Sequence, residues 1–259
     1  GDLKLDGVAV TAGQSIAVAD LGKLVYAPAA NANGAGYASF TFQVQDNGGT
    51  ADGGADLSSV AGTITVDVTS VNDAPAGADK TVTVLEDGSY TFAASDFGFS
   101  DTNDSPANAL LAVVIATLPA AGTLKLDGVA VTAGQSIAVA DLGKLVYAPA
   151  ANANGAGYAS FTFQVQDNGG TADGGADLAA VASTITVDVT SVNDAPAGAD
   201  RTVTVLEDGS YTFSASDFGF SDESDSPANS FSAVKIATLP GAGELKLDGV
   251  AVTAGQSVA

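Results

Sequence analysis

The sequence predicts an all-β protein made of tandem antiparallel β-sandwich domains. Apolar and polar residues alternate over short stretches, as in strands with one buried face, and no stretch sustains a helical period. Val, Thr, Tyr and Phe favour strands, while the 31 glycines and the many Asp and Asn residues favour tight turns. A segment of 121 residues recurs along the chain, which indicates that one kind of domain is repeated.

The repeat is nearly exact in sequence. Two motifs mark it, Leu-Lys-Leu-Asp-Gly at residues 3–7, 124–128 and 245–249 and Val-Asn-Asp-Ala-Pro at residues 71–75 and 192–196. Residues 1–71 differ from residues 122–192 at four positions, and residues 72–138 differ from residues 193–259 at eleven. A period of 121 residues is that of a domain, because solenoid coils repeat every 20–50 residues or so.

The segment Asn-Asp-Ala-Pro-Ala-Gly at residues 72–77 is the best candidate for a linker. Pro75 has no N–H to donate to a sheet, and small residues surround it. This boundary predicts the C-terminal part of one repeat at 1–71, a complete repeat at 72–192 and the N-terminal part of the next at 193–259. The absence of an initial Met and the partial repeats indicate a piece of a longer protein.

Strand patterns follow one another through the complete repeat. Asp127-Gly128 predicts a two-residue type I′ hairpin, because both residues tolerate positive φ. Phe161, Phe163 and Val165 alternate with polar residues, which predicts one buried face. Loops are expected at 152–157 and 167–170. The expected strands are 81–85, 90–92, 110–115, 124–126, 129–131, 136–139, 144–147, 158–165 and 184–189.

The composition excludes several classes of protein. The chain has no Cys, His, Met or Trp, so zinc fingers, thiol nucleophiles and imidazole bases are ruled out. With 30 acidic and 8 basic residues the net charge is −22, which disfavours binding to nucleic acid. No apolar run approaches the roughly 20 residues that span a bilayer, so we expect no membrane insertion in this segment.

Carboxylates concentrate in two segments of the complete repeat, residues 85–89 and 95–108. Neither segment contains Lys or Arg, so no cation within them relieves the repulsion between the acidic groups. Ca²⁺ prefers carboxylate, amide and carbonyl oxygens, whereas softer metals would need sulfur or imidazole ligands. The residues therefore predict a calcium site, although Asp87-Gly88 also suits a turn.

Several motifs, taken in order, resemble the cadherin-like repeats of giant bacterial RTX adhesins, and also chondroitin-sulfate-proteoglycan-type repeats. These motifs are Leu-Pro at 118–119, Gly-Thr-Leu at 122–124, Asp-Gly-Val-Ala-Val at 127–131, Leu-Val-Tyr-Ala-Pro at 145–149, residues 160–167, and the pair 184–189 and 192–196. The resemblance implies cadherin-like or Ig-like domains joined end to end, with Ca²⁺ at the joints. It also implies a secreted, surface-attached protein of a Gram-negative bacterium, exported by type I secretion.

The same resemblance implies a set of calcium ligands. Glu86, and Glu207 in the next repeat, match the glutamate early in a cadherin domain that reaches the linker at its far end. The joint at 193–194 would use Asn193, Asp194, Asp217, Asp222 and Asp225. The preceding joint would use Asn72, Asp73, Asp96, Asp101 and Asp104, and Asp167 would serve a local loop site. Two departures from the family, Ser70 or Ser191 in place of Asp and residues 151–154 in place of an acidic trio, imply fewer ions per joint.

We therefore expect a calcium-stiffened extender, or stalk, of a bacterial cell-surface adhesin that acts in cell adhesion and biofilm formation. Its expected partners are neighbouring repeats of the same chain. An alternative is a self-assembling extracellular fibre or matrix subunit whose sandwiches are completed between copies, as in donor-strand exchange. A carbohydrate- or ice-binding module is disfavoured because the chain has no Trp. Enzymatic activity is not expected, because the paired carboxylates lie in linker-type loops.

Overall fold

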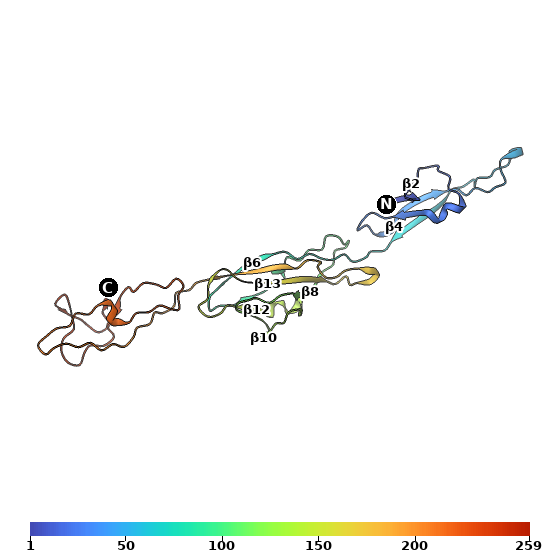
Figure 1. Cartoon of the computed structure of the whole chain (residues 1–259). Helices are drawn as coiled ribbons and strands as arrows, with labels where there is room; N and C mark the ends of the chain where they lie inside the picture. The colour runs from blue at the N-terminus through green and yellow to red at the C-terminus, as the bar shows by residue number, and fades with distance from the viewer.

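The structure is a computed structural model that describes all residues 1–259. We refer to residues 1–71, 72–192 and 193–259 as the N-terminal, central and C-terminal units. The N-terminal and C-terminal units lie at opposite ends of the central unit, and the whole chain is elongated (Figure 1). None of the helices in the structure has the length and hydropathy of a membrane-spanning segment.

The central unit is a sandwich of two sheets, and its two layers are visible in Figure 1. The smaller sheet has the order β10-β9-β12-β7, formed by β10 (Val129–Ala130), β9 (Thr123–Leu126), β12 (Leu145–Ala148) and β7 (Tyr90–Thr91). The larger sheet has the order β11-β8-β13-β14-β6, formed by β11 (Ser136–Ala138), β8 (Leu110–Ile115), β13 (Gly155–Asp167), β14 (Ser183–Thr190) and β6 (Lys80–Leu85). The all-β sandwich expected from the sequence is confirmed.

One pair of strands departs from the expected antiparallel arrangement. β14 pairs with β6 in parallel, with Val187 opposite Val82. The parallel pairing follows from the path of the chain. β6 begins after the linker at one end of the unit, and β14 ends before the linker at the other end. Both strands therefore run from the N-terminal unit towards the C-terminal unit, and their parallel pairing lets the units follow one another end to end (Figure 1).

The core of the central unit is aromatic and aliphatic. Phe92 packs edge-on against Phe161 with ring centroids 5.5 Å apart, and Phe97 packs against Phe163 at 4.9 Å. These four rings are fully buried, as is Val165, which confirms the alternation expected along β13. Because polar side chains on the opposite face of β13 stay partly exposed, the sheet has one apolar face.

Residues with positive φ shape a hairpin of the smaller sheet and a bulge of the larger one. Asp127 and Gly128 both have positive φ, 49° and 79°, as the predicted type I′ hairpin requires. The prediction of a loop at 152–157 is wrong for its second half, because β13 begins at Gly155. A bulge between Gly155 and Ala159 shifts the register there, and Gly157 takes a φ of 60° that suits glycine.

The other two units contain only part of the sandwich. The N-terminal unit has β1 (Asp2–Leu5), β2 (Val8–Ala9), β3 (Leu24–Ala27), β4 (Gly34–Phe42) and β5 (Gly62–Val68). The C-terminal unit has β15 (Val234–Lys235), β16 (Lys246–Leu247), β17 (Val250–Ala251) and β18 (Ser257–Val258). Short 3₁₀ helices complete the chain: η1 (Val18–Lys23), η2 (Ala51–Gly53), η3 (Ala94–Phe97), η4 (Val139–Lys144), η5 (Ala172–Gly174) and η6 (Ala215–Phe218).

Candidate cation site

Glu86 lies at the end of β6 that faces the C-terminal unit, and its side chain is buried. One carboxylate oxygen accepts hydrogen bonds from the Val192 N–H at 2.6 Å and from the Ser191 hydroxyl at 3.1 Å. The other accepts one from the Asn154 amide at 3.0 Å. Three donors thus hold the carboxylate of Glu86 beside the linker that begins at Asn193.

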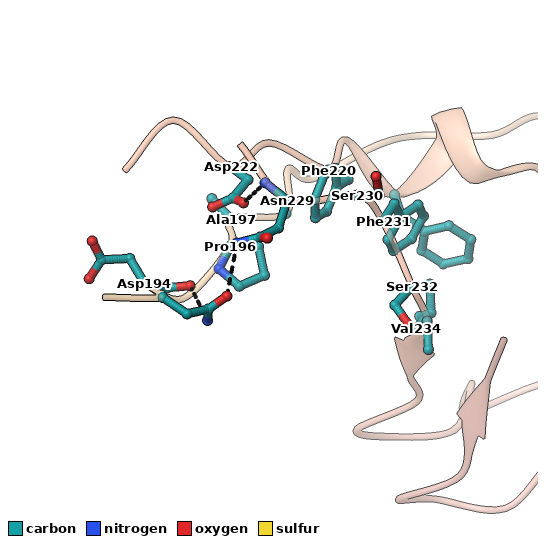
Figure 2. Close-up of a pocket in the computed structure, with 14 residues that line it drawn as sticks. Asp194, Pro196, Ala197, Phe220, Asp222, Asn229, Ser230, Phe231, Ser232 and Val234 are labelled. Carbon is teal, nitrogen blue, oxygen red and sulfur yellow. Dashed lines mark hydrogen bonds between the residues drawn. The ribbon is translucent and has the colours of Figure 1, made fainter. Parts of the chain in front are cut away.

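The C-terminal unit supplies the other side of this joint. The Asp194 N–H donates to both carboxylate oxygens of Asp225, at 3.1 and 3.2 Å. The Asn229 amide donates to Asp225 at 3.0 Å and to the Asn193 side chain at 2.8 Å. The Asn229 N–H donates to Asp222 at 2.5 Å, and Figure 2 shows Asp194, Asp222 and Asn229 gathered at one end of a pocket.

Glu86, Asp194 and Asp225 form what we call the joint cluster. One carboxylate oxygen of each lies within 4.8 Å of the others. None of the five ion pairs in the structure involves these residues, so no Lys or Arg neutralises them. One oxygen of Asp194 and one of the neighbouring Asp222 are buried without any hydrogen-bond partner. A buried carboxylate oxygen without a partner is costly, and a bound cation would satisfy it.

The charges of the joint cluster act on one another. Burial raises the pKa of Asp194, and the negative charges of Asp87, Asp225 and Glu86 raise it further. Hydrogen bonds from Asn154 and from the Val192 N–H lower the pKa of Glu86, against the opposing effect of its desolvation. Glu86 is therefore held as an anion next to an Asp194 whose charged form is disfavoured, and a dication would relieve this repulsion.

The donor set fits a hard cation. Glu86 comes from the central unit, Asp194 from the linker and Asp225 from the C-terminal unit, and all three offer carboxylate oxygens. Ca²⁺ takes about six to eight oxygen ligands and accepts irregular geometry, whereas Mg²⁺ demands a regular octahedron. The arrangement can hold Ca²⁺ with ligands drawn from both units at once.

The preceding joint repeats half of this arrangement. The Asp73 N–H donates to Asp104 at 2.9 Å, as Asp194 does to Asp225. Burial and the nearby charge of Asp101 raise the pKa of Asp104. The N-terminal unit contains no Glu, so this joint has no counterpart of Glu86 within the described chain.

A second group of polar side chains surrounds Asn72 at the same end of the central unit. The Asn72 amide donates to Asp167 at 3.0 Å and to the Ala176 carbonyl at 2.7 Å, and it accepts from Asn108. The Asn108 N–H in turn donates to Asp101. One oxygen of Asp101 and one of the fully buried Asp167 have no partner. The expected local site at Asp167 thus lies beside the linker residue Asn72.

Three expected ligands do not reach a joint cluster. Asp96 forms an ion pair with Lys80 at 2.6 Å and accepts from the Ala93 N–H at 2.8 Å, which ties it to the start of η3. Asp217 accepts from the Ser214 N–H at 2.7 Å and from the Tyr211 hydroxyl at 3.1 Å at the start of η6. Glu207 is exposed. Neither acidic segment contains a basic residue, as the sequence shows, but Lys80 from outside them reaches Asp96 in space and neutralises it.

Sequence reasoning also missed some residues of the joint. Asn154 binds Glu86, although the segment 151–154 had counted against calcium because it lacks acidic residues. Asn229 forms hydrogen bonds with Asn193, Asp222 and Asp225. Its only signal in the sequence is that an Asn preceded by Ser-Pro-Ala ends the acidic segment in both repeats. Asp87 belongs to an acidic segment that also suits a turn; its φ of 61° supports the turn, and its charge also raises the pKa of Asp194.

Comparison with known families agrees with this fold. Residues 72–190 match the model of a family described as bacterial Ig domain. This match supports a bacterial Ig-like or cadherin-like repeat, a kind of domain that is usually extracellular or surface-attached and typically structural rather than enzymatic. No curated protein and no solved structure matches the chain.

Proposed function

We propose that this chain is part of the stalk of a bacterial cell-surface adhesin and that Ca²⁺ bound at its joints stiffens the stalk. The observation that carries the proposal is the convergence of Glu86, Asp194 and Asp225, from two units and the linker between them, with no basic side chain beside them. In this role the repeats hold a distal adhesive domain away from the cell during adhesion and biofilm formation.

The stiffening follows from where the ligands originate. A cation that needs oxygens from both units binds only the arrangement in which the units are docked, so it shifts the population towards that arrangement. Without the cation, repulsion among the carboxylates favours separation of the units. The parallel pair β6 and β14 passes tension through the central unit, because the strands that connect to its two neighbours are bonded to each other.

The test compares solution dimensions of the chain with Ca²⁺, with Mg²⁺ and with a chelator. We expect small-angle scattering to show a narrower, more extended particle only with Ca²⁺. The combined variant Glu86→Gln, Asp194→Asn and Asp225→Asn should lose this response. The control variant Asp127→Asn, Asp141→Asn and Asp173→Asn removes the same charge away from the joint and should keep it. An unchanged response in the first variant would contradict the proposal.

Export by type I secretion, as in RTX adhesins, is the second part of the proposal, and the support for it is the motif resemblance together with the absence of Cys. Deleting the type I exporter of the native host should abolish display of the protein on the cell surface, as measured with an antibody to the repeat. Undiminished display would contradict this part alone.

A further inference from the structure

We infer that the joint after the central unit bends at one place, the two residues Val192 and Asn193. The rest of the linker moves with one unit or with the other. The bend lies between two clamps, both of which consist of hydrogen bonds and are complete within the central unit. The exit clamp holds the chain where it leaves this unit, and the entry clamp holds the chain where it enters.

The exit clamp consists of Glu86 and the residues that it holds, Thr190, Ser191 and Val192. The Glu86 N–H donates to the Thr190 carbonyl at 2.9 Å, which extends the pairing of β6 with β14. The buried Glu86 carboxylate accepts from the Ser191 hydroxyl at 3.1 Å and from the Val192 N–H at 2.6 Å. Hydrogen bonds to an ionised acceptor are among the strong ones, so the chain is fixed to the central unit as far as the nitrogen of Val192.

The entry clamp holds Asn72 by its main chain and by its side chain at once. The Asn72 carbonyl accepts from the Ala176 N–H at 2.9 Å. The Asn72 amide donates to the Ala176 carbonyl at 2.7 Å and to the Asp167 carboxylate at 3.0 Å, and its side-chain oxygen accepts from the Asn108 amide. The chain is therefore fixed to the central unit from the side chain of Asn72 onward.

Two glycines allow the hairpin between β13 and β14 to approach Asn72 this closely. A methyl group placed on Gly169 would lie 1.8 Å from the side-chain oxygen of Asn72. One placed on Gly175 would lie 3.1 Å from the Asn72 carbonyl oxygen. Any larger residue at 169 would therefore displace Asn72 from the clamp.

The two clamps fall on adjacent residues of the repeat. Asn193 is the counterpart of Asn72 within the Val-Asn-Asp-Ala-Pro motif that both joints share. At the joint after the central unit, the exit clamp thus ends at Val192 and the residue of the entry clamp follows directly. The Asn193 side chain accepts from Asn229 at 2.8 Å there, as Asn72 accepts from Asn108.

The peptide link between the clamps has no hydrogen bond of its own. Neither the Val192 carbonyl nor the Asn193 N–H has a partner, and the same is true of the Val71 carbonyl and the Asn72 N–H. Because the peptide group is planar, the soft torsions of this link are the φ and ψ angles beside it. Rotation about them turns one unit against the other without breaking either clamp.

A bend confined to two residues determines how the chain moves without metal. The linker residues on both sides stay bonded to their units, so the spacing of the units changes little while their relative orientation varies. A cation in the joint cluster would narrow the range of orientations, but it would not move the bend. The hinge therefore goes beyond the proposed stiffening and does not require it.

Val192→Gly tests the hinge, because glycine adopts a wider range of φ and ψ and keeps the N–H that binds Glu86. The chain has no Cys, so Val129→Cys and Val250→Cys can carry spin labels on either side of the joint. In chelator, electron–electron double resonance should give a broader distance distribution for Val192→Gly than for the labelled parent. Val192 is 42% exposed, so its truncation leaves the core of the central unit intact.

Two further glycine variants are the controls. Val181→Gly makes the same change at a loop residue that is 78% exposed, and it should leave the distribution unchanged. Ala195→Gly lies in the linker beyond the hinge, between Asp194 and Ala197, which are both bonded to the C-terminal unit. It should also leave the width unchanged. A Val192→Gly distribution no broader than the parent's would overturn the hinge, and so would equal broadening by Ala195→Gly.

Gly169→Ala tests the entry clamp at the preceding joint, with spin labels at Val8→Cys and Val129→Cys. The added methyl group displaces Asn72, so bending should spread into the residues that follow and broaden the distribution. Asn72→Ala, which removes the side-chain bonds without adding atoms, should broaden it as well. Gly143→Ala is the control, because its methyl group meets no atom within 4 Å. Unchanged widths in both clamp variants would overturn the confinement of the bend.

Calcium distinguishes a failure of the hinge from a failure of the proposed function. If Val192→Gly broadens the distribution in chelator but Ca²⁺ does not narrow that of the parent, the hinge holds and the proposed stiffening fails. If Ca²⁺ narrows the distribution of the parent but Val192→Gly leaves it unchanged in chelator, the stiffening holds and the hinge is overturned.

Discussion

Glu86 is the central residue of the proposed joint, because it binds the end of β6 to the residues just before the linker. Its three donors, Asn154, Ser191 and the Val192 N–H, come from segments more than 65 residues away in sequence. The same carboxylate faces Asp194 and Asp225 across the joint. Glu86 therefore lies between the last residues of the central unit, to which it is hydrogen-bonded, and the acidic residues of the next unit.

The pKa values of Asp194 and Glu86 should be displaced in opposite directions from their ordinary values. Without metal, we expect the pKa of Asp194 to lie above its ordinary value, because of burial and neighbouring charges, and that of Glu86 below its ordinary value, because of its hydrogen bonds. Because the raised pKa of Asp194 belongs to the docked state, its contribution favours docking at low pH and is lost as pH rises through that pKa. The groups that lower the pKa of Glu86 all lie within the central unit, so its contribution stabilises that unit and is lost as pH falls through the lowered pKa.

Carbon-detected NMR of the side-chain carboxyls measures both values directly. Added Ca²⁺ should lower the apparent pKa of Asp194, because the metal binds the ionised form. An Asp194 that titrates at or below its ordinary value without metal would contradict the electrostatic account of the joint.

At the scale of the elements, the core strands of the central unit and their copies in the partial units differ in burial, not in sequence. Phe163 on β13 is fully buried, while Phe42 on β4 is 40% exposed. Both belong to the same Ser-Phe-Thr-Phe-Gln-Val motif. In the central unit β13 has a strand on each side within the larger sheet, and the smaller sheet covers its apolar face. β4 has only β5 beside it.

Phe163→Ala should therefore destabilise the central unit by about 3–5 kcal/mol, the usual cost of removing a buried aromatic ring. Phe42→Ala, the same change in the same sequence motif, should leave the unfolding of the central unit unchanged. Urea denaturation followed by tyrosine fluorescence measures both. Equal effects of the two variants would mean that the partial and complete units are packed alike.

The strands could be predicted because the sequence pattern that encodes them is local. Alternation along residues 158–165 and the Asp-Gly turn at 127–128 specify a strand and a hairpin without reference to the rest of the chain. The parallel pairing of β6 with β14 was not predicted, because it depends on the path of the chain through two linkers. The bulge at Gly155 escaped prediction because its glycines also suit a loop.

The candidate site was predictable in part for the same reason. Glu86, Asp194 and Asp225 are acidic residues in Gly- and Ser-rich segments, and the family resemblance assigns them roles. Asp96 and Asp217 have the same local character, yet each caps a 3₁₀ helix, and a local cap cannot be told from a ligand by composition. The sequence did not predict a role for Asn154, because its partner Glu86 is distant in sequence and the two meet only in the folded unit.

At the scale of the whole molecule, the net charge of −22 predicts that docking of the units responds to cations. Acidic residues outnumber basic ones throughout the chain, so neighbouring units repel one another at low ionic strength. Monovalent salt screens this repulsion everywhere, but only a cation with ligands from both units bridges a joint.

Ca²⁺ should raise the thermal stability of the chain beyond what salt achieves. Ligand binding to the folded state alone adds about 2.7 kcal/mol when the free ligand is about 100 times its dissociation constant. Differential scanning calorimetry with Ca²⁺, with Mg²⁺ and with NaCl at matched ionic strength should show the largest increase in melting temperature with Ca²⁺. Equal increases in all three would indicate screening alone.

The most direct test of the calcium-stiffened joint is the distribution of distances across it. The chain has no native Cys, so Val129→Cys and Val250→Cys place single spin labels on equivalent exposed hairpins of the central and C-terminal units. Electron–electron double resonance should give one narrow distance distribution with Ca²⁺ and a broad one with chelator, and the Glu86, Asp194 and Asp225 variant should stay broad in both. Distributions of equal width with and without Ca²⁺ would contradict the account.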